Sequence, residues 1–393
     1  MSPFGPELEK FREEVISFLE RELVPLVDKI ERENYFAREF IEACGREGYL
    51  GSLFPKEYGG TERGAVAEVI IAEETAAICP AMEMSRASSC VLFAFPVFKF
   101  GTEEQRREYL APVIKGEKLG ALGITEPGAG SDITMIATTA EKKGNEWVIN
   151  GEKRFITNGS VADFILVYAK IKGGPEDPRK ALTAFIVETE WSGFEVVKDF
   201  ELMGMRGVRN SHLRFKDLRV PKENVLGGVG NGYQVMMAGL DVERTIIAAG
   251  CIGYAVGAFE QAVRYSMERV QFDRPIRKFE AISFRIADMA TKILAARLLV
   301  MHAARAVDEG RRATLEAAIA KVFASEMACE VCDDALQILG GIGYTKEMPV
   351  EKFYRDARLM KIGAGTSEIQ RFIIQREIYK IYDQMGKEKK RII

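Results

Sequence analysis

One glutamate stands out as a candidate for proton chemistry. Glu243 lies in the run Leu-Asp-Val-Glu-Arg at residues 240–244, near the start of a long stretch with helical spacing. A carboxylate that becomes buried beside a bound ligand has a raised pKa and can hold a proton taken from carbon. The alternative is a solvated helical carboxylate paired with a nearby Arg or Lys. Glu243 is therefore a candidate general base, and the residue types alone leave the alternative open.

A glycine-rich run offers a second kind of site. Residues 123–132 read Gly-Ile-Thr-Glu-Pro-Gly-Ala-Gly-Ser-Asp. Small residues let backbone N–H groups converge on an anion without interference from Cβ atoms. Thr125 and Ser131 add hydroxyl donors. Taken alone, the run is also compatible with an ordinary turn between a helix and a strand.

Three further runs carry polar groups at suggestive spacing. Residues 155–159 read Phe-Ile-Thr-Asn-Gly, residues 269–276 read Arg-Val-Gln-Phe-Asp-Arg-Pro-Ile, and residues 337–344 read Gln-Ile-Leu-Gly-Gly-Ile-Gly-Tyr. A guanidinium fork such as that of Arg269 suits phosphate oxygens. A glycine break between helices permits close approach of the backbone. Each run is weak evidence alone, and a charged helix end or a plain strand end is the alternative.

Together these runs resemble the acyl-CoA dehydrogenases, and the matches extend from near the N-terminus to about residue 380. The resemblance implies FAD as cofactor, an acyl thioester of coenzyme A as substrate and electron-transferring flavoprotein as electron acceptor. It also implies a homo-oligomer, a dimer of dimers, because the flavin is contacted by two subunits.

The resemblance assigns cofactor contacts residue by residue. Thr157 corresponds to the threonine that hydrogen-bonds the flavin near N5, and Arg269 to the arginine that reaches the pyrophosphate in the neighbouring subunit. Three positions depart from the family pattern: Phe155 replaces a tryptophan, Asp273 a glycine and Glu280 a glutamine. The implied cofactor-binding residues are Leu122, Thr125, Gly130, Ser131, Phe155, Thr157, Arg269, Phe272, Glu280, Gln337, Gly340, Gly341, Thr366 and Glu368.

The implied reaction removes the α-proton of the thioester to a base while the β-hydrogen leaves as hydride. Most relatives carry the base at the position of Ala364, in the run Gly-Ala-Gly-Thr-Ser-Glu at residues 363–368. The isovaleryl-CoA dehydrogenases place it instead on the helix of Glu243, and both halves of that pattern occur here. The backbone N–H of Ala364 then remains as a donor to the thioester oxygen. The resemblance assigns substrate contacts to Ser131, Asp241, Arg244, Ala364 and Gly365.

The acyl group is not fixed by the sequence. This location of the base is associated with short branched chains, and also occurs with long ones. Arg86 lies in Met-Ser-Arg-Ala-Ser-Ser at residues 84–89, a segment that lines the acyl pocket in relatives. It indicates either a carboxylate-bearing or cyclic acyl group, or a surface or salt-bridged arginine. We expect a short, branched or cyclic acyl group.

Three other functions share the scaffold. An acyl-CoA oxidase would pass electrons to oxygen. A flavin monooxygenase would need reduced flavin from a partner and no such base, which the pair of Glu243 and Ala364 argues against. A flavin-holding relative that binds nucleic acid would need a basic groove, and 55 Lys plus Arg against 58 Asp plus Glu give a net charge of -3. We therefore expect no nucleic-acid partner.

These motifs must be positioned by a mostly α-helical chain with a central β domain. Helical spacing prevails in residues 1–118, as in Leu8–Ile30, and returns from 229 to 393. Residues 119–228 hold short strand-like runs divided by Gly, Asn and Pro. This order is not the alternation of a Rossmann fold. We predict an N-terminal helical domain, a middle β-barrel or sandwich domain and a C-terminal four-helix bundle domain with these boundaries.

Composition limits the setting. The six cysteines do not form a dense disulfide framework. A structural zinc site at Cys329 and Cys332 would need two more ligands, and the only histidines in the sequence are His212 and His302. We expect two helix-borne cysteines, no metal site and a reducing cytoplasm. The N-terminus lacks the apolar core of a signal peptide, and no uninterrupted apolar stretch approaches 18 residues, so we expect no membrane span. The basic run at 387–391 reads as a frayed end.

Overall fold

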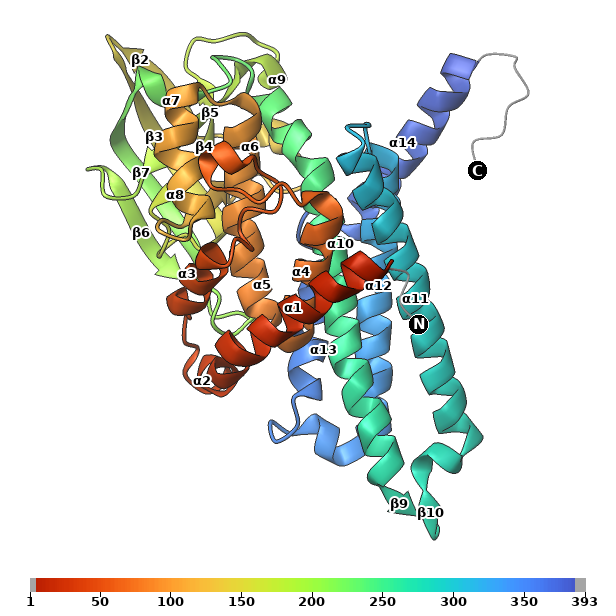
Figure 1. Cartoon of the computed structure of the whole chain (residues 1–393). Coiled ribbons are helices and arrows are strands. Elements are labelled where there is room, and N and C mark those ends of the chain that lie inside the picture. The colour runs from red at the N-terminus through yellow and green to blue at the C-terminus, as the bar shows by residue number, and fades with distance from the viewer. Residues whose placement is uncertain (1–4, 386–393) are drawn as a thin grey trace.

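The computed structural model describes residues 5–385. A twisted sheet lies on one side, long helices lie on the other, and the N-terminal helices pack in front of both (Figure 1). The basic run at 387–391 lies outside the described residues. The expected arrangement, mostly helical with a central β part, is confirmed.

The N-terminal part is helical as predicted, although Leu8–Ile30 is not one helix. Pro25 lacks a backbone N–H, and the helix gives way to a 3-10 turn, η1 (Val24–Leu26), before α2 begins. Two segments, η3 (Ser88–Phe93) and η4 (Arg106–Leu110), are π-helical. The helices are α1 (Pro6–Glu22), α2 (Val27–Glu33), α3 (Arg38–Arg46), α4 (Gly64–Ile78), α5 (Pro80–Ala87), α6 (Ala94–Phe100), α7 (Glu103–Gln105) and α8 (Ala111–Ile114).

The predicted strand runs form one eight-stranded sheet, ordered β6-β7-β3-β2-β4-β5-β8, with β1 pairing in parallel with β4. Its strands alternate buried and exposed residues where one face meets solvent, whereas β4 and β5 are buried throughout most of their length. The strands are β1 (Gly120–Gly123), β2 (Thr139–Lys143), β3 (Glu146–Thr157), β4 (Phe164–Ile171), β5 (Leu182–Glu188), β6 (Phe194–Asp199), β7 (Asn210–Pro221) and β8 (Val225–Leu226), with the short helix α9 (Pro178–Ala181) before β5.

The C-terminal part is built on the longest helix, α10 (Gly232–Glu268). Its contacts with α12 and with α4 are more extensive than those between any other two described helices. Glycines make this possible, because a Cβ at Gly253 would collide with the carbonyl of Glu73 and one at Gly257 with Phe353. The remaining elements are β9 (Val270–Gln271), β10 (Arg274–Pro275), α11 (Glu280–Asp308), α12 (Thr314–Leu339), the 3-10 helix η8 (Gly340–Tyr344), α13 (Val350–Met360) and α14 (Ser367–Met385).

By length and apolar composition alone, α10 is the single described helix that could cross a membrane. Within the protein, 61% of its most apolar window is buried. The apolar residues of α10 therefore belong to the interior shared with α4 and α12, the usual situation of a core helix.

Candidate active site

A narrow apolar cavity lies where the helices meet the sheet. Its walls come from η3, α6, β1, β4 and α10, so all three parts of the chain contribute. Glu243 and the hydroxyl-bearing Tyr168 are its polar lining residues. The cavity is lined by Val91, Leu92, Pro96, Leu122, Ile124, Tyr168, Met236, Gly239, Leu240 and Glu243.

Glu243 lies in the fourth turn of α10 and is only 8% exposed. Within residues 5–385 no hydrogen bond or ion pair to its carboxylate is found. Burial raises the pKa of Glu243 to about 7, against the opposing effect of the positive charges on Arg244 and Lys321. The solvated, paired carboxylate considered above is therefore not what the structure shows.

Asp241 and Arg244 support this turn of the helix. Arg244 Nη1 donates to Asp241 Oδ1 at 3.2 Å, and Thr314 Oγ1 at the start of α12 donates to Asp241 Oδ2 at 2.6 Å. Arg244 is buried, and burial lowers its pKa. The two residues predicted to contact substrate thus also tie the first turns of α10 to α12.

The second predicted part of the site is the loop between α13 and α14. Ala364 and Gly365 adopt left-handed backbone conformations, with φ of 54° and 82°. Gln370 Nε2 donates to the carbonyls of Ala364 and Gly365, both at 3.0 Å. Within the described chain the N–H of Ala364 has no acceptor. The same holds for the N–H groups of Gly365 and Thr366, so the loop presents free backbone donors.

The glycine-rich run follows β1 and forms an open loop. A Cβ at Gly128 or Gly130 would meet no atom within 4 Å, and Ser131 is exposed. Beneath the loop, Lys153 Nζ donates to Glu126 Oε1 at 2.7 Å and to the carbonyl of Ile124 at 3.0 Å. A buried ion pair thus holds an open, donor-rich surface in place.

Thr125 lies in the loop after β1, and Thr157 lies at the end of β3. The carbonyl of Thr125 accepts a hydrogen bond from the N–H of Arg154 at 2.8 Å, which joins the loop to β3. Thr157 is the last residue of β3 and half-buried. Phe155, two residues before it, is 55% exposed and has φ of 59°, at a bulge where β3 shifts register against β7.

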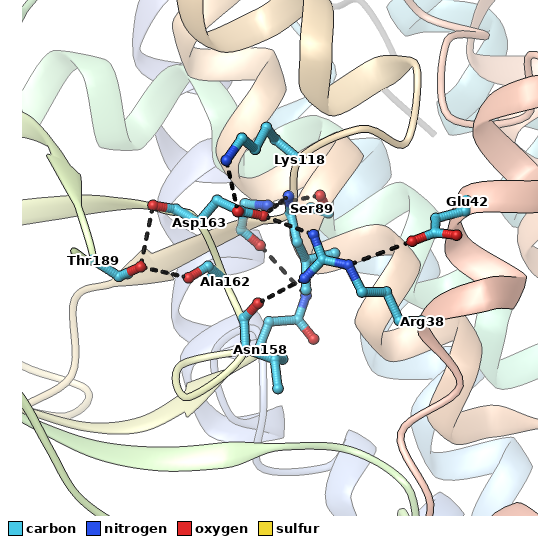
Figure 2. A network of polar contacts seen from close by, with 11 residues as sticks. Arg38, Glu42, Ser89, Lys118, Asn158, Ala162, Asp163 and Thr189 are labelled. Carbon is cyan, nitrogen blue, oxygen red and sulfur yellow. Dashed lines mark hydrogen bonds and ion pairs between the residues drawn. The ribbon is translucent and has the colours of Figure 1, made fainter.

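A polar network fixes the turn that follows Thr157 (Figure 2). Asn158 Nδ2 donates to the carbonyl of Ser85 at 2.8 Å, which connects the sheet to α5. Asp163 accepts hydrogen bonds from Arg38 of α3 and from Lys118, both at 3.0 Å. The N-terminal helices therefore anchor the segment that carries Thr157.

The other predicted cofactor residues lie far from Glu243 in the same chain. Arg269 ends α10, 26 positions after Glu243, which is about 39 Å along a straight helix. Phe272, in the turn between β9 and β10, is 87% exposed. The members of this exposed group, here called the distal group, are Arg269, Phe272, Glu280, Gln337, Gly340 and Gly341.

Asp273 keeps the turn although it replaces a glycine. Phe272 and Asp273 have φ of 51° and 61°, the left-handed conformations of a two-residue hairpin turn. Aspartate tolerates this region better than most residues, so the departure from the family pattern preserves the hairpin.

Thr366 and Glu368 lie at the start of α14. Thr366 Oγ1 accepts a hydrogen bond from the N–H of Ile369 at 3.3 Å, which caps the helix. Glu368 is exposed, and hydrogen bonds to its carboxylate from its own backbone and from Thr366 lower its pKa.

Arg86 is salt-bridged, one of the two alternatives for this residue, but it is not at the surface. It is fully buried, with Nη2 2.6 Å from Glu68 Oε1 and Nε 2.7 Å from Glu83 Oε2. Its charge is engaged inside the helical domain, and it does not line the cavity. The prediction of two helix-borne cysteines is confirmed, since Cys329 and Cys332 lie in α12 with free thiols.

Four residues of the site were missed by motif reasoning: Tyr168, Lys153, Lys321 and Gln370. Lys321 is the one with a detectable signal, a single charge among apolar residues in Ala-Ala-Ile-Ala-Lys-Val-Phe-Ala at 317–324. Such a lysine is almost never fully buried unless paired, so it marks a position worth examining.

Comparison with known families covers nearly the whole chain. The acyl-CoA dehydrogenase N-terminal, middle and C-terminal domain families match residues 5–117, 121–218 and 230–379. The chain belongs to the acyl-CoA dehydrogenase family.

Individual members resemble the chain over their full length. The probable acyl-CoA dehydrogenase YngJ of Bacillus subtilis is 41% identical over 95% of this chain and 98% of its own. The caffeyl-CoA reductase-Etf complex subunit CarC of Acetobacterium woodii is 39% identical over 96% and 99%. The mitochondrial isovaleryl-CoA dehydrogenase of Pongo abelii is 38% identical over 94% and 88%. The structure of butyryl-CoA dehydrogenase from Megasphaera elsdenii superposes with a TM-score of 0.93 at 36% identity, over 96% and 100%.

Acyl-CoA dehydrogenases are FAD-dependent oxidoreductases, and the residues present fit that cofactor. The open loop at Gly128 and Gly130 leaves room for a ligand that a side chain would fill. The exposed ring of Phe155 offers an apolar surface, smaller than an indole and without its N–H donor.

Proposed function

We propose that Glu243 is the catalytic base of an FAD-dependent dehydrogenation that converts a short, branched or cyclic acyl-CoA to its 2-enoyl-CoA. The observation that carries the proposal is a buried carboxylate in the wall of an apolar cavity, to which residues 5–385 offer no hydrogen bond or ion pair. Burying a carboxylate in this way is costly, and strongly perturbed acids in cavities are common at functional sites.

A pKa near 7 suits Glu243 to this task. At neutral pH a large fraction is ionised and able to accept the α-proton, and the neutral form that results is favoured by its apolar surroundings. A base whose pKa is close to the working pH transfers protons efficiently in both directions.

The α-proton of a thioester is weakly acidic, so negative charge that develops on the carbonyl oxygen needs a donor. The free N–H of Ala364 is suited to this role. The left-handed backbone of this residue sets the direction of the N–H before a ligand binds. Because the donor belongs to the backbone, an alanine at this position keeps it.

The residues that would hold FAD are Thr125, Gly130 and Ser131 of the open loop together with Leu122, Phe155 and Thr157. The chemistry that bound FAD supplies is acceptance of the β-hydrogen as hydride. The distal group is proposed to contact cofactor across a subunit boundary, which the distance along α10 from Glu243 supports. Thr366 and Glu368 are proposed to contact cofactor from the start of α14, next to the loop of Ala364. A dimer of dimers remains our proposal for the assembly.

The narrowness of the cavity supports a small acyl group. The branched residues Val91, Leu92 and Ile124 share the lining of the cavity with Glu243. Arg86 is already paired with two carboxylates, so it is not free to bind an acyl group that carries its own carboxylate.

Electron-transferring flavoprotein is the proposed acceptor, supported by the relative whose name places it in a complex with Etf. An acyl-CoA oxidase remains the alternative, and rapid oxygen consumption during turnover would support it. A nucleic-acid-binding role would need a basic groove, which a net charge of -3 does not suggest. The six cysteines, all free, support a reducing cytoplasmic location.

The same site also supports the reverse reaction, reduction of a 2-enoyl-CoA. A relative of 39% identity is named a reductase, and a glutamate with a pKa near 7 can return the proton it took. Direction would then be set by the redox partner rather than by Glu243.

The experiment is anaerobic mixing of the FAD-loaded protein with straight, branched, cyclic and dicarboxylic acyl-CoAs, followed by flavin absorbance. We expect rapid bleaching with short straight or branched chains and slow or no bleaching with long and dicarboxylic ones. If no acyl-CoA reduces the flavin while a chemically reduced sample is rapidly reoxidised by 2-enoyl-CoA, the reductive direction replaces the oxidative one.

A further inference from the structure

One lysine of α12 is buried, and its hydrogen-bond partners among the described residues are backbone carbonyl groups. Lys321 has 0% residue exposure, and its Nζ donates to the carbonyls of Met360 at 2.8 Å and Gly365 at 2.7 Å. Within the described residues no carboxylate forms a salt bridge with it. A buried ammonium without an ion-pair partner costs free energy, so its presence calls for a reason.

Those two carbonyls bracket the loop that carries Ala364. Met360 is the last residue of α13, and Gly365 follows Ala364 directly. Gln370 adds two further bonds from α14 to the carbonyls of Ala364 and Gly365. Lys321 and Gln370 together hold both ends of a segment with two left-handed residues, a conformation that needs support from its surroundings.

The same ammonium acts on Glu243. The charge of Lys321 lowers the pKa of Glu243 against the larger raising effect of burial, and Glu243 in turn opposes the lowering of the Lys321 pKa that burial causes. The other groups around Glu243 are Tyr168 from β4 and, on α10 itself, Asp241 and Arg244, with Arg376 of α14 next to Arg244. Lys321 is the cation that reaches Glu243 from a different helix.

We propose that Lys321 is a positioning residue that fixes the Ala364 peptide for the thioester oxygen and whose charge also acts on Glu243. One side chain would thereby couple the donor to the base. The proposal rests on the function proposed above, because it assigns Lys321 its effect through those two groups.

The test uses variants that separate the loss of hydrogen bonds to the loop from the loss of the positive charge. Lys321→Met removes both the loop bonds and the charge, whereas Gln370→Leu removes loop bonds and leaves the charge. Lys142→Met, on an exposed position of β2, is the control for loss of a lysine. If Lys321→Met does not fold, Lys321→Gln removes the charge while keeping an amide donor.

Two readouts are needed. The first is amide hydrogen exchange of residues 361–366 in the FAD-loaded protein without substrate, where we expect faster exchange in Lys321→Met and Gln370→Leu. The second is the pH dependence of flavin reduction by a short acyl-CoA. We expect both variants to be slower by about tenfold or more, in keeping with loss of a well-placed donor.

Only loss of the Lys321 charge should move the acidic limb of the rate profile. Without that charge the Glu243 pKa rises, so the limb moves to higher pH, by about half a unit or more. An unmoved limb in both Lys321 variants, or unchanged exchange in residues 361–366, would overturn the proposal. If Glu243→Gln were as fast as wild type, the proposed base would fail instead, whatever the Lys321 variants show.

Discussion

Two glutamates in this protein are almost equally buried, and their pKa values move in opposite directions. Glu126 is 6% exposed and Glu243 is 8% exposed. Burial raises the pKa of both, yet for Glu126 this is outweighed by Lys153 and by hydrogen-bond donors, and its pKa falls. Glu243 has no such donors, and its pKa rises to about 7.

The difference lies in the donors that each carboxylate meets. Glu126 accepts hydrogen bonds from Lys153 Nζ at 2.7 Å and from the N–H groups of Ala137 at 2.6 Å and Thr138 at 3.1 Å. Glu243 faces apolar cavity walls instead. Satisfying a buried carboxylate makes it structural, whereas leaving it unsatisfied keeps it available for a proton.

The largest expected effect is on catalysis. Glu243→Gln should slow flavin reduction by an acyl-CoA about 10³-fold or more, because the amide cannot accept the α-proton. FAD content should stay normal. Glu260→Gln, on an exposed position of the same helix, is the matched control and should react like wild type. Anaerobic stopped-flow absorbance provides the rates.

Loss of the structural glutamate should act on stability instead. Glu126→Gln leaves the Lys153 ammonium buried without its partner and should lower the free energy of unfolding by about 3 kcal/mol. Glu141→Gln is the control, because Glu141 pairs with Lys172 at the surface and its loss should have a much smaller effect. Urea unfolding measures both, and equal losses would contradict the distinction drawn between the two pairs.

The pH dependence of stability should have opposite signs at the two sites. Because its pKa is raised, Glu243 contributes stability that is fully present below about pH 4.5 and is lost as the pH rises through about 7. Over that range the free energy of unfolding of Glu243→Gln should therefore rise relative to that of wild type, by at most about 3 kcal/mol.

Glu126 has a lowered pKa, so its contribution is present at neutral pH and lost in acid. The deficit of Glu126→Gln should therefore shrink as pH falls below about 4.5. Unfolding curves of both variants and wild type at several pH values supply the comparison. Parallel pH profiles for the two variants would contradict the assigned environments.

The smallest effect concerns the support of Glu243. Thr314→Val removes the hydroxyl that donates to Asp241 and should lower the free energy of unfolding by about 1 kcal/mol. Flavin reduction should slow by less than about tenfold, since Arg244 still holds Asp241. A loss of rate as large as that of Glu243→Gln would mean that Asp241, and not Glu243, dominates proton transfer.

Sequence reasoning reached the motifs and the order of helices and strands, because these depend on local spacing and on resemblance to one family. The domain boundaries after residues 118 and 228 and the individual cofactor contacts stay predictions. The helical spacing of Leu8–Ile30 did not predict the helix break at Pro25, although a proline inside a helical pattern indicates one. The regular spacing of the apolar residues was given more weight than this single proline.

The full set of groups that determine the pKa of Glu243 could not be predicted from the sequence. Of the two charges that oppose burial, Arg244 is the next residue in the chain, but Lys321 comes 78 positions later, and the cavity wall needs Tyr168 from the sheet. Likewise, Glu126 looked like part of a loop motif, and its pairing with Lys153 depends on how β1 and β3 are placed. Contacts between distant segments set these pKa values, and local patterns do not encode them.

The most direct test of the central claim is exchange of the α-protons of a 3-thia acyl-CoA in D2O, followed by proton NMR. In this thioester sulfur replaces the β-carbon, so hydride cannot leave and proton removal is observed alone. The account predicts rapid exchange with the FAD-loaded wild type and with Glu260→Gln, and almost none with Glu243→Gln. Exchange by Glu243→Gln at the wild-type rate would contradict it, because another group would then be removing the proton.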